Sequence, residues 1–252
     1  MWRKLSAVLS SALLVTLITL TASSAFAQRQ TPPPYEGPFV NVLGAFVTPI
    51  PGQPLTAVVE ITSTQTLSNG FTESEHTFRN IARDSQGRIY NERRLMVGDS
   101  FKGDPPRLGF HIFDPVAKLN TFLDPATHLA RQSNWTAPPT LTEPGDTAPV
   151  APRDLLVAQE DMGTQTMENV SVRGTRKTTT IPASASGTGK SIQVIDEIWY
   201  SDELRLNMLV RHTDPRSGQQ IVTITHVDRA EPAHTWFEIP PNYKIVDENP
   251  VP

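Results

Sequence analysis

Residues 204–213, with the sequence LRLNMLVRHT, decide the fold class of this chain. Large apolar side chains occupy every second position from Leu204 to Val210, and polar side chains such as Asn207 and Arg211 lie between them. A period of two indicates a β-strand, because successive side chains of a strand point to opposite faces of the sheet. We therefore expect a sheet with one buried face and one solvated face.

Turn signals separate this stretch from similar runs on both sides. Asp214 and Pro215 precede the run 219–229, and a carboxylate before a proline is typical of a tight turn. Asn69 and Gly70 supply the positive-φ pair of a hairpin. Further turns are predicted at Asp84 to Gly87, at Asp124 with Pro125, and near Glu168 with Asn169. They separate the strand-like runs 55–62, 71–83, 88–97, 117–123, 127–132, 161–182 and 192–200.

Connections this short imply a mainly antiparallel meander, since parallel neighbours need crossover segments of a dozen or more residues. Helical periodicity is nearly absent. A turn or two of helix is expected around 232–237, and a second short helix near 154–159. The predicted fold is mostly β, a meander sheet with one or two short helices. The pattern alone leaves open whether the sheet curls, closes or packs on a second sheet.

The N-terminus has the form of a secretory leader. Arg3 and Lys4 precede an apolar run at 5–20, and Ala25, Phe26 and Ala27 form a small-x-small cleavage site. We predict a signal peptide at 1–27, a Pro-rich extended arm at 28–54 and a single β-rich domain at 55–252, interrupted by a Pro-rich loop at 136–152. The product is expected in the periplasm or outside the cell, with no transmembrane anchor after cleavage.

Composition excludes several classes of function. The chain has 22 Lys and Arg against 26 Asp and Glu, and a net charge of −4 argues against nucleic acid as a partner. It contains no cysteine, which removes disulfides, thiolate nucleophiles and a lipid-attachment cysteine. The six histidines form no His-x-His or His-x-x-x-His pair, so no metal site and no cofactor are predicted.

Motifs of catalysis are weak. The run 187–191, Gly-Thr-Gly-Lys-Ser, matches the end of a phosphate-binding loop, but strand-like residues follow it where a helix is required. No Gly-x-Ser-x-Gly is present, and the carboxylates Glu73 and Glu75 fit a solvated strand face. We identify no catalytic residue, and enzyme activity is left open with a non-catalytic role preferred.

Four residues are candidates for binding a ligand. Leu206, Met208 and Val210 belong to the apolar stripe of the strand predicted at 204–213. Trp199 lies among the aromatic residues of the last quarter of the chain. The alternative is that all four fill an ordinary core.

Three segments carry a resemblance to known proteins, and they are 113–132, 162–176 and 197–243. They resemble a family of uncharacterised secreted bacterial proteins of the Acidobacteria type. The closing Phe-x-x-Pro at 237–240 and its meander are similar to periplasmic lipoprotein carriers and envelope stress sensors. The resemblance to the carriers implies a strongly curved, half-barrel-like antiparallel sheet that binds acyl chains or lipoprotein segments on its concave side.

These observations give three expectations of function. The first is an exported, non-catalytic envelope protein that binds a hydrophobic ligand or a lipoprotein segment on one sheet face, with a lipid, an acyl chain or an envelope protein as its partner. The second is a periplasmic scaffold that holds a partner through exposed hairpin edges. The third is a hydrolase of unknown substrate.

Overall fold

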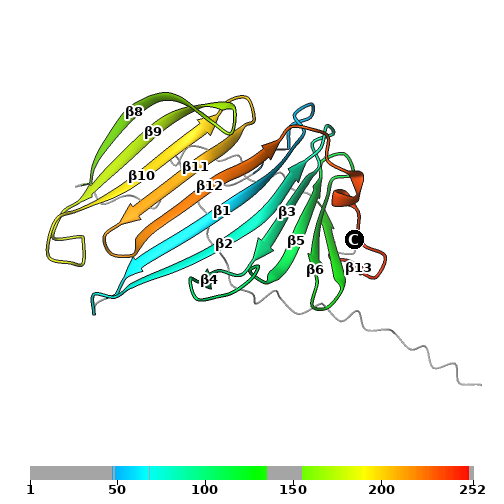
Figure 1. The fold of residues 1–252 in the computed structure, drawn as a ribbon, viewed down its shortest axis with the longest axis horizontal. Helices are drawn as coiled ribbons and strands as arrows, with labels where there is room; N and C mark the ends of the chain where they lie inside the picture. Colours follow the sequence, from blue (N-terminus) through cyan, green and yellow to red (C-terminus); the bar gives the residue numbers. More distant parts are fainter. Residues whose placement is uncertain (1–46, 48, 68, 135–154, 250–252) are drawn as a thin grey trace, which may run out of the picture. The chain divides into compact units, whose positions relative to one another are not determined.

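The structure, a computed structural model, describes residue 47 and residues 49–67, 69–134 and 155–249. The chain divides into two units, 1–36 and 37–252, and every described residue lies in the second. These residues form one open, curved sheet of 13 strands (Figure 1), which confirms the predicted fold class. The predicted signal peptide, most of the predicted arm and the predicted loop 136–152 lie outside the described residues.

Most described strands lie within or overlap the predicted runs, but residues 107–114 and 244–247 also form strands that were not predicted. In chain order they are β1 (Leu55–Thr66), β2 (Thr72–Arg83), β3 (Ile89–Arg94), β4 (Val97–Gly98), β5 (Arg107–Asp114), β6 (Leu119–Asp124), β7 (Leu129–Asn134), β8 (Leu156–Met167), β9 (Val170–Ile181), β10 (Ile192–Ser201), β11 (Leu206–Asp214), β12 (Gly218–Asp228) and β13 (Lys244–Asp247). A short 3-10 helix, η1 (His234–Phe237), precedes β13.

The sheet consists of two antiparallel meanders joined side by side. Its strand order is β13-β7-β6-β5-β3-β2-β1-β12-β11-β10-β9-β8, with β4 paired to β2. The meanders meet where β1 pairs with β12, which places Val59 opposite Ile224 although the two residues are far apart in the chain. The one departure from the antiparallel pattern in the described part of the chain is β13, which runs parallel to β7.

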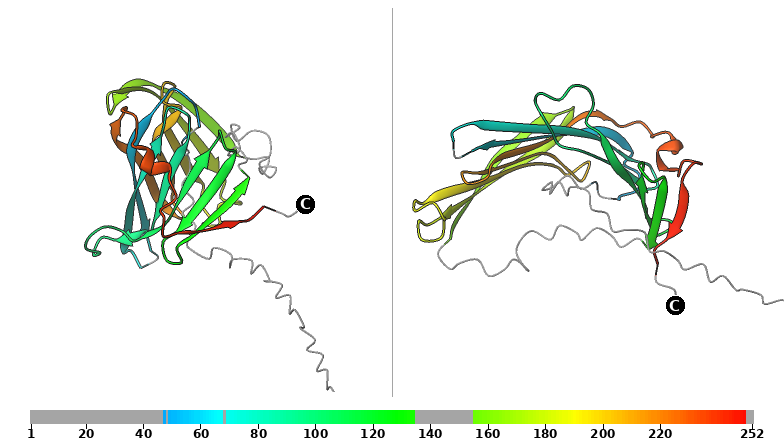
Figure 2. Two further views of the ribbon diagram at one scale, coloured as in Figure 1. Left: turned by 90° about the vertical axis from the view of Figure 1, so that its right-hand side faces the viewer. Right: turned by 90° about the horizontal axis from the view of Figure 1, so that it is seen from below.

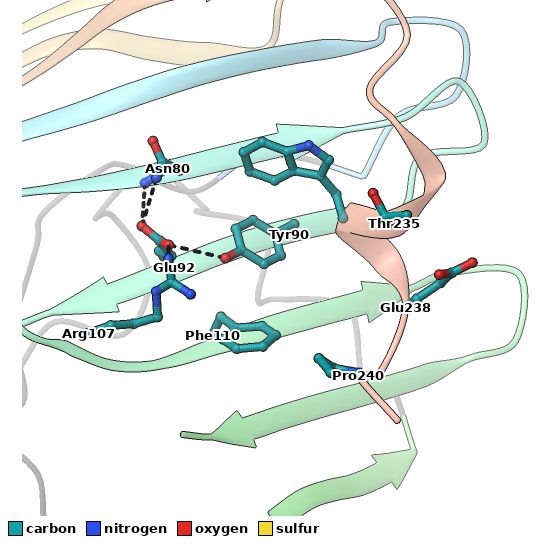
Figure 3. Close-up of a pocket in the computed structure, with 9 residues that line it drawn as sticks. Asn80, Tyr90, Glu92, Arg107, Phe110, Thr235, Glu238 and Pro240 are labelled. Atoms are coloured by element: carbon teal, nitrogen blue, oxygen red, sulfur yellow. Dashed lines mark hydrogen bonds and ion pairs between the residues drawn. The ribbon is translucent and has the colours of Figure 1, made fainter. Parts of the chain in front are cut away.

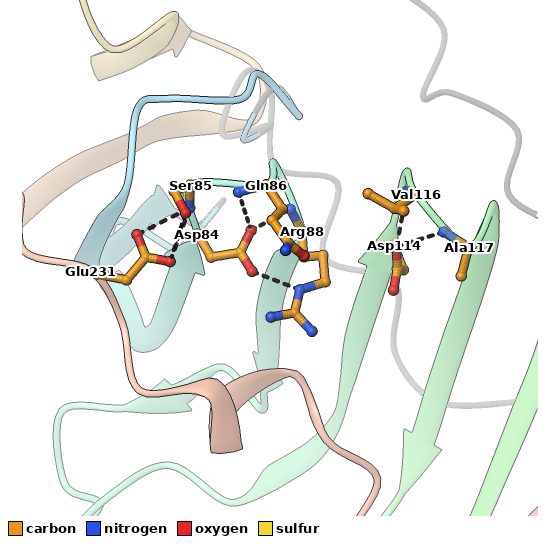
Figure 4. Close-up of polar contacts among 8 residues, drawn as sticks. All are labelled: Asp84, Ser85, Gln86, Arg88, Asp114, Val116, Ala117 and Glu231. Carbon is orange, nitrogen blue, oxygen red and sulfur yellow. Dashed lines mark hydrogen bonds and ion pairs between the residues drawn. The ribbon is translucent and has the colours of Figure 1, made fainter.

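Turn chemistry explains where the strands reverse. Gly70 and Gly87 have φ values of +84° and +85°, a conformation that glycine adopts without strain. At the turn before β3, Asp84 Oδ1 accepts hydrogen bonds from the backbone N–H groups of Gln86 and Arg88, and Glu231 binds Ser85 from a distant segment (Figure 4). Asp114 caps the next hairpin in the same way. The predicted turns are therefore confirmed.

One helix prediction is confirmed and one is wrong. The 3-10 helix η1 lies within the predicted 232–237. The helix expected near 154–159 is instead the start of β8, where Leu156 pairs with Thr180 and Val157 with Thr179. Pairing with the β-branched threonines of β9 supplies ladder hydrogen bonds in place of helical ones, so tertiary context outweighs local propensity.

The two faces of the sheet differ in chemistry, and we name them by a central residue. Residues that pair across strands share a face. The Val59 face carries a large apolar cluster, and the Tyr90 face carries an aromatic cluster over β3, β5, β6 and β7, packed against η1. Figure 2 shows η1 outside the bend of the sheet. The aromatic cluster consists of Ala82, Tyr90, Phe110, Ile112, Leu123, Ala130 and Phe237, with Trp236, Ile239 and Tyr243 beside it.

Candidate ligand-binding site

An apolar patch occupies the Val59 face where the two meanders join. Ile61 of β1 pairs with Val222 of β12, and Val222 pairs with Val210 of β11. Because these pairs are in register, their side chains form continuous rows across three strands. The apolar patch comprises Leu55, Ala57, Val59, Ile61, Ile81, Ile89, Met208, Val210, Val222 and Ile224, which are all buried.

The predicted ligand-binding residues all lie in the apolar cluster, but on different faces. Leu206, Met208 and Val210 are buried at alternate positions of β11. In the register, Val210 lies opposite Ile198 while Trp199 lies opposite Leu209. Trp199 and Val210 therefore project from opposite faces of the sheet.

The one helix that the structure describes, η1, lies on the Tyr90 face, and no second sheet lies over the patch among the described residues. Val47, which precedes β1, packs in the patch and is 6% exposed.

A buried arginine fixes the border of the patch. Arg83 is fully buried, its Nε donates to the carbonyl oxygen of Gln53 at 2.7 Å, and its Nη1 donates to that of Leu204 at 3.1 Å. Burial lowers the pKa of Arg83 to about 10, so the side chain remains charged at neutral pH. It ties the segment before β1 to the turn between β10 and β11.

Beside the apolar patch, the same face carries a polar group of residues that we call the Arg79 cluster. It consists of Arg79 on β2, Asn91 and Arg93 on β3, His111 on β5 and Asn120 on β6. His111 lies 4.8 Å from Phe122 and 5.6 Å from Phe113 between ring centroids. Burial, together with the positive charges of Arg93 and Arg79, lowers the pKa of His111 to about 4, although Asn120 opposes this. His111 is neutral at pH 7.

A pocket lies on the Tyr90 face between the sheet and the C-terminal segment (Figure 3). Its volume is about 320 Å³, at the lower end of the range for small-molecule sites. Tyr90 packs edge-on against Trp236, with ring centroids 4.9 Å apart. The lining residues are Asn80, Tyr90, Glu92, Arg107, Phe110, Thr235, Trp236, Glu238 and Pro240.

The carboxylate at the base of this pocket is already saturated with donors. Glu92 is 1% exposed. Its Oε2 accepts from the backbone and side-chain nitrogens of Asn80 and from Arg94, and its Oε1 lies 2.7 Å from Arg107 Nη2 and 3.3 Å from the Tyr90 hydroxyl. Burial and the charge of Glu92 raise the pKa of Tyr90, which therefore remains protonated.

Charged residues form a row on the Tyr90 face of the other meander. Glu160, Arg176, Glu197 and Arg211 stand on the neighbouring strands β8 to β11, and each pairs with the next in the register. Arg176 Nη1 lies 3.2 Å from Glu160 Oε2, and Arg211 Nη1 lies 3.1 Å from Glu197 Oε2. The alternation of sign binds four strands together and leaves this region of the face polar.

Sequence reasoning missed the Arg79 cluster and the pocket. Both consist of single residues from several strands, and their proximity depends on the β2–β3 and β3–β5 registers. The alternation of side chains along a strand shows only on which face of the sheet Arg79 and Glu92 lie. It does not show that these charged side chains are buried. The one indication of the Arg79 cluster in the sequence was that polar side chains occupy positions of β2, β3 and β5 that belong to the buried face.

The described residues lack two features of other functional classes. They contain no helix long and apolar enough to cross a membrane. They also contain no group of three His, Asp or Glu side chains arranged to hold a metal ion.

No family model matches the sequence, and no curated protein matches it. Similar solved structures include an uncharacterized conserved protein from Thermus thermophilus, with a TM-score of 0.41 and 10% identity over 78% of this chain and 91% of that one. MucB has a TM-score of 0.37 and 9% identity over 77% of this chain and 60% of its own. Lipoprotein LppX of Mycobacterium tuberculosis has a TM-score of 0.25 and 15% identity over 72% and 90%. All three similarities are of low sequence identity, and each of the three TM-scores is below 0.5.

Proposed function

We propose that this protein is an exported, non-catalytic binding protein that holds an apolar chain, such as an acyl chain, against the apolar patch of the Val59 face. The observation that carries the proposal is the row of paired aliphatic residues on β1, β12 and β11, represented by Ile61, Val222 and Val210. This row of aliphatic residues continues over three neighbouring strands of the curved sheet. An elongated apolar ligand is the class that such a surface fits.

In this proposal, the ligand reaches the apolar patch by displacing Val47. This residue lies in the patch without belonging to a strand, and its burial at 6% exposure supports a patch that is closed in the free protein. A bound chain takes the place of Val47, so the ligand gains the contacts that Val47 gives up. Export is supported by the leader-like residues 1–27, which carry a basic start, an apolar run and a small-x-small end.

Two measurements test the proposal. Mass spectrometry of an organic extract of the purified protein should detect a lipid, and calorimetric titration with decanol should show saturable binding. Val222→Thr places a hydroxyl on the patch and should weaken decanol binding several-fold, at a cost of about 1–2 kcal/mol. The neighbouring Thr223→Val alters the opposite face and serves as the matched control. Absence of both lipid and decanol binding overturns the proposal.

A substitution at Val47 separates ligand binding from an ordinary core. If the ligand displaces Val47, Val47→Ala lowers the cost of opening and increases decanol affinity. If Val47 belongs to a closed core, the same substitution lowers the melting temperature and leaves decanol affinity unchanged.

A second candidate function is protein binding at the sheet edge. β8 is the last strand of the order, and its Leu156 and Val157 are 73% and 57% exposed. An edge strand with exposed apolar residues is a template for the addition of another strand. Crosslinking in cells should give discrete adducts that Val157→Lys abolishes, while the control Thr164→Lys on the same strand retains them.

A further inference from the structure

The Arg79 cluster interrupts an otherwise apolar face. Arg79 pairs with Val59 in the register, and Asn91 pairs with Ile81. The polar cluster and the apolar patch are therefore direct neighbours on the same face. Phe113 joins them, since it packs against the apolar cluster and lies stacked on the ring of His111.

Two buried polar atoms of the Arg79 cluster have no hydrogen-bond partner among the described residues. They are Nε of Arg79 and Oδ1 of Asn91, whereas Asn120 raises the pKa of His111 through a side-chain hydrogen bond. Each buried polar atom without a partner costs free energy, on the order of 1–3 kcal/mol. Two such atoms on neighbouring strands of one face call for a polar partner.

The positive charge of the Arg79 cluster favours an anionic ligand. Arg79 makes no ion pair with a described carboxylate. Its pKa is lowered to about 10 by burial and by the nearby charge of Arg93, which still leaves Arg79 protonated at neutral pH. The next arginine on this face, Arg131, differs in charge environment, because its Nε forms an ion pair with Oε1 of Glu248 at 3.9 Å, although it makes no hydrogen bond. A guanidinium that is buried beside a second guanidinium is stabilised most by an anion.

We propose that the Arg79 cluster binds the anionic head group of the ligand whose apolar chain lies on the patch, so that the protein selects anionic amphiphiles. The inference rests on the proposed function, because the patch supplies the binding of the chain. The Nε–H of Arg79 donates to the anion, while Phe113 lies at the junction between the head group and the chain.

The test compares two ligands of equal chain length. Calorimetric titration of the purified protein at pH 8 with decanoate and with decanol should show at least tenfold tighter binding of decanoate. Arg79→Gln removes the charge and should reduce decanoate affinity about tenfold, as expected for a charge-assisted hydrogen bond, while decanol affinity stays the same. Arg131→Gln removes an arginine from the same face and is the matched control, with decanoate affinity unchanged.

The outcomes distinguish the two proposals. Equal affinities for decanoate and decanol in the wild type overturn the anion site and leave the apolar site intact. Binding of neither ligand overturns the apolar site. A decanol affinity that falls with decanoate affinity in Arg79→Gln shows general damage, and it overturns a head-group role for Arg79.

A further measurement does not depend on any variant. Acetate and decanoate carry the same head group, and acetate at 10 mM, a concentration chosen for the experiment, should compete with decanoate only weakly. Because the Arg79 side chain is buried, added salt should screen its contact with the carboxylate only weakly. Competition by acetate as strong as that of an equal concentration of decanoate contradicts the proposal.

Discussion

Trp199 donates its indole N–H to Oε1 of Glu197, two residues earlier on the same strand, at 3.0 Å. Glu197 also contacts Arg211 and Arg176 on the two strands that flank β10. Burial raises the pKa of Glu197, but the indole hydrogen bond and the two arginine charges outweigh it and hold the pKa below its ordinary value. Trp199, one of the four residues predicted to bind a ligand, therefore helps to hold a carboxylate of the charged row in place.

We expect Trp199→Phe to destabilise the fold by about 1–2 kcal/mol, since one hydrogen bond to a charged group is lost. The depressed pKa of Glu197 stabilises the fold above the unfolded-state pKa, and this contribution is lost as the pH falls through the folded-state pKa. Urea titrations at pH 7 and pH 3.5, chosen to bracket this range, should show a smaller difference in Trp199→Phe than in the wild type. Equal differences contradict the prediction.

Gly174 lies beneath the Trp199 ring. A Cβ at this position would stand 2.7 Å from ring atoms of Trp199. Gly174→Ala should therefore cost about 1–3 kcal/mol by overpacking. Gly98→Ala is the control, because its nearest neighbour, the carbonyl oxygen of Ser74, would be 3.9 Å away. Thermal denaturation of both variants measures the difference, and equal melting temperatures would contradict the proposed contact.

The sequence predicted strands and turns well because each depends on neighbouring residues. Asn69 binds the N–H of Phe71 through its side chain, and Glu168 and Asn169 both have positive φ, as their turn requires. The short helix expected near 154–159 was wrong, because pairing with β9 decides the conformation of β8.

The long-range arrangement could not be predicted. The pairing of β1 with β12 brings Val59 to Ile224, and nothing in either segment specifies the other. The same holds for the Arg79 cluster, whose members come from β2, β3, β5 and β6 and meet only after the registers are set. The predicted ligand-binding role of Leu206, Met208 and Val210 stays a prediction.

His111 should remain neutral to unusually low pH. Burial is the main cause, the charges of Arg93 and Arg79 add to it, and Asn120 opposes it, with a resulting pKa of about 4. The unfolded chain binds a proton near pH 6.5, so stability should fall as the pH drops from 6.5 towards 4, by on the order of 2 kcal/mol at pH 5. The Arg131 and Glu248 pair also faces this region.

Nuclear magnetic resonance of the imidazole ring should show no titration of His111 above pH 5. In His111→Gln, the loss of unfolding free energy between pH 7 and pH 5 should be smaller than in the wild type. Protonation of the ring near pH 6.5 would show that the ring is not buried among like charges.

Arg83 should be irreplaceable by lysine. Its Nε and Nη1 donate to the carbonyl oxygens of Gln53 and Leu204, which belong to segments 151 residues apart in the chain. Lysine offers one ammonium group in place of a planar fork, so it cannot bridge both oxygens with the same geometry. We expect Arg83→Lys to destabilise the fold by about 2–4 kcal/mol, because a buried carbonyl loses its donor and a charge remains without a full set of partners.

Arg173→Lys, at an exposed position of β9, should change stability by less than about 0.5 kcal/mol. Urea denaturation of the two variants compares them directly, and equal small effects would show that the bridge between the two segments contributes little.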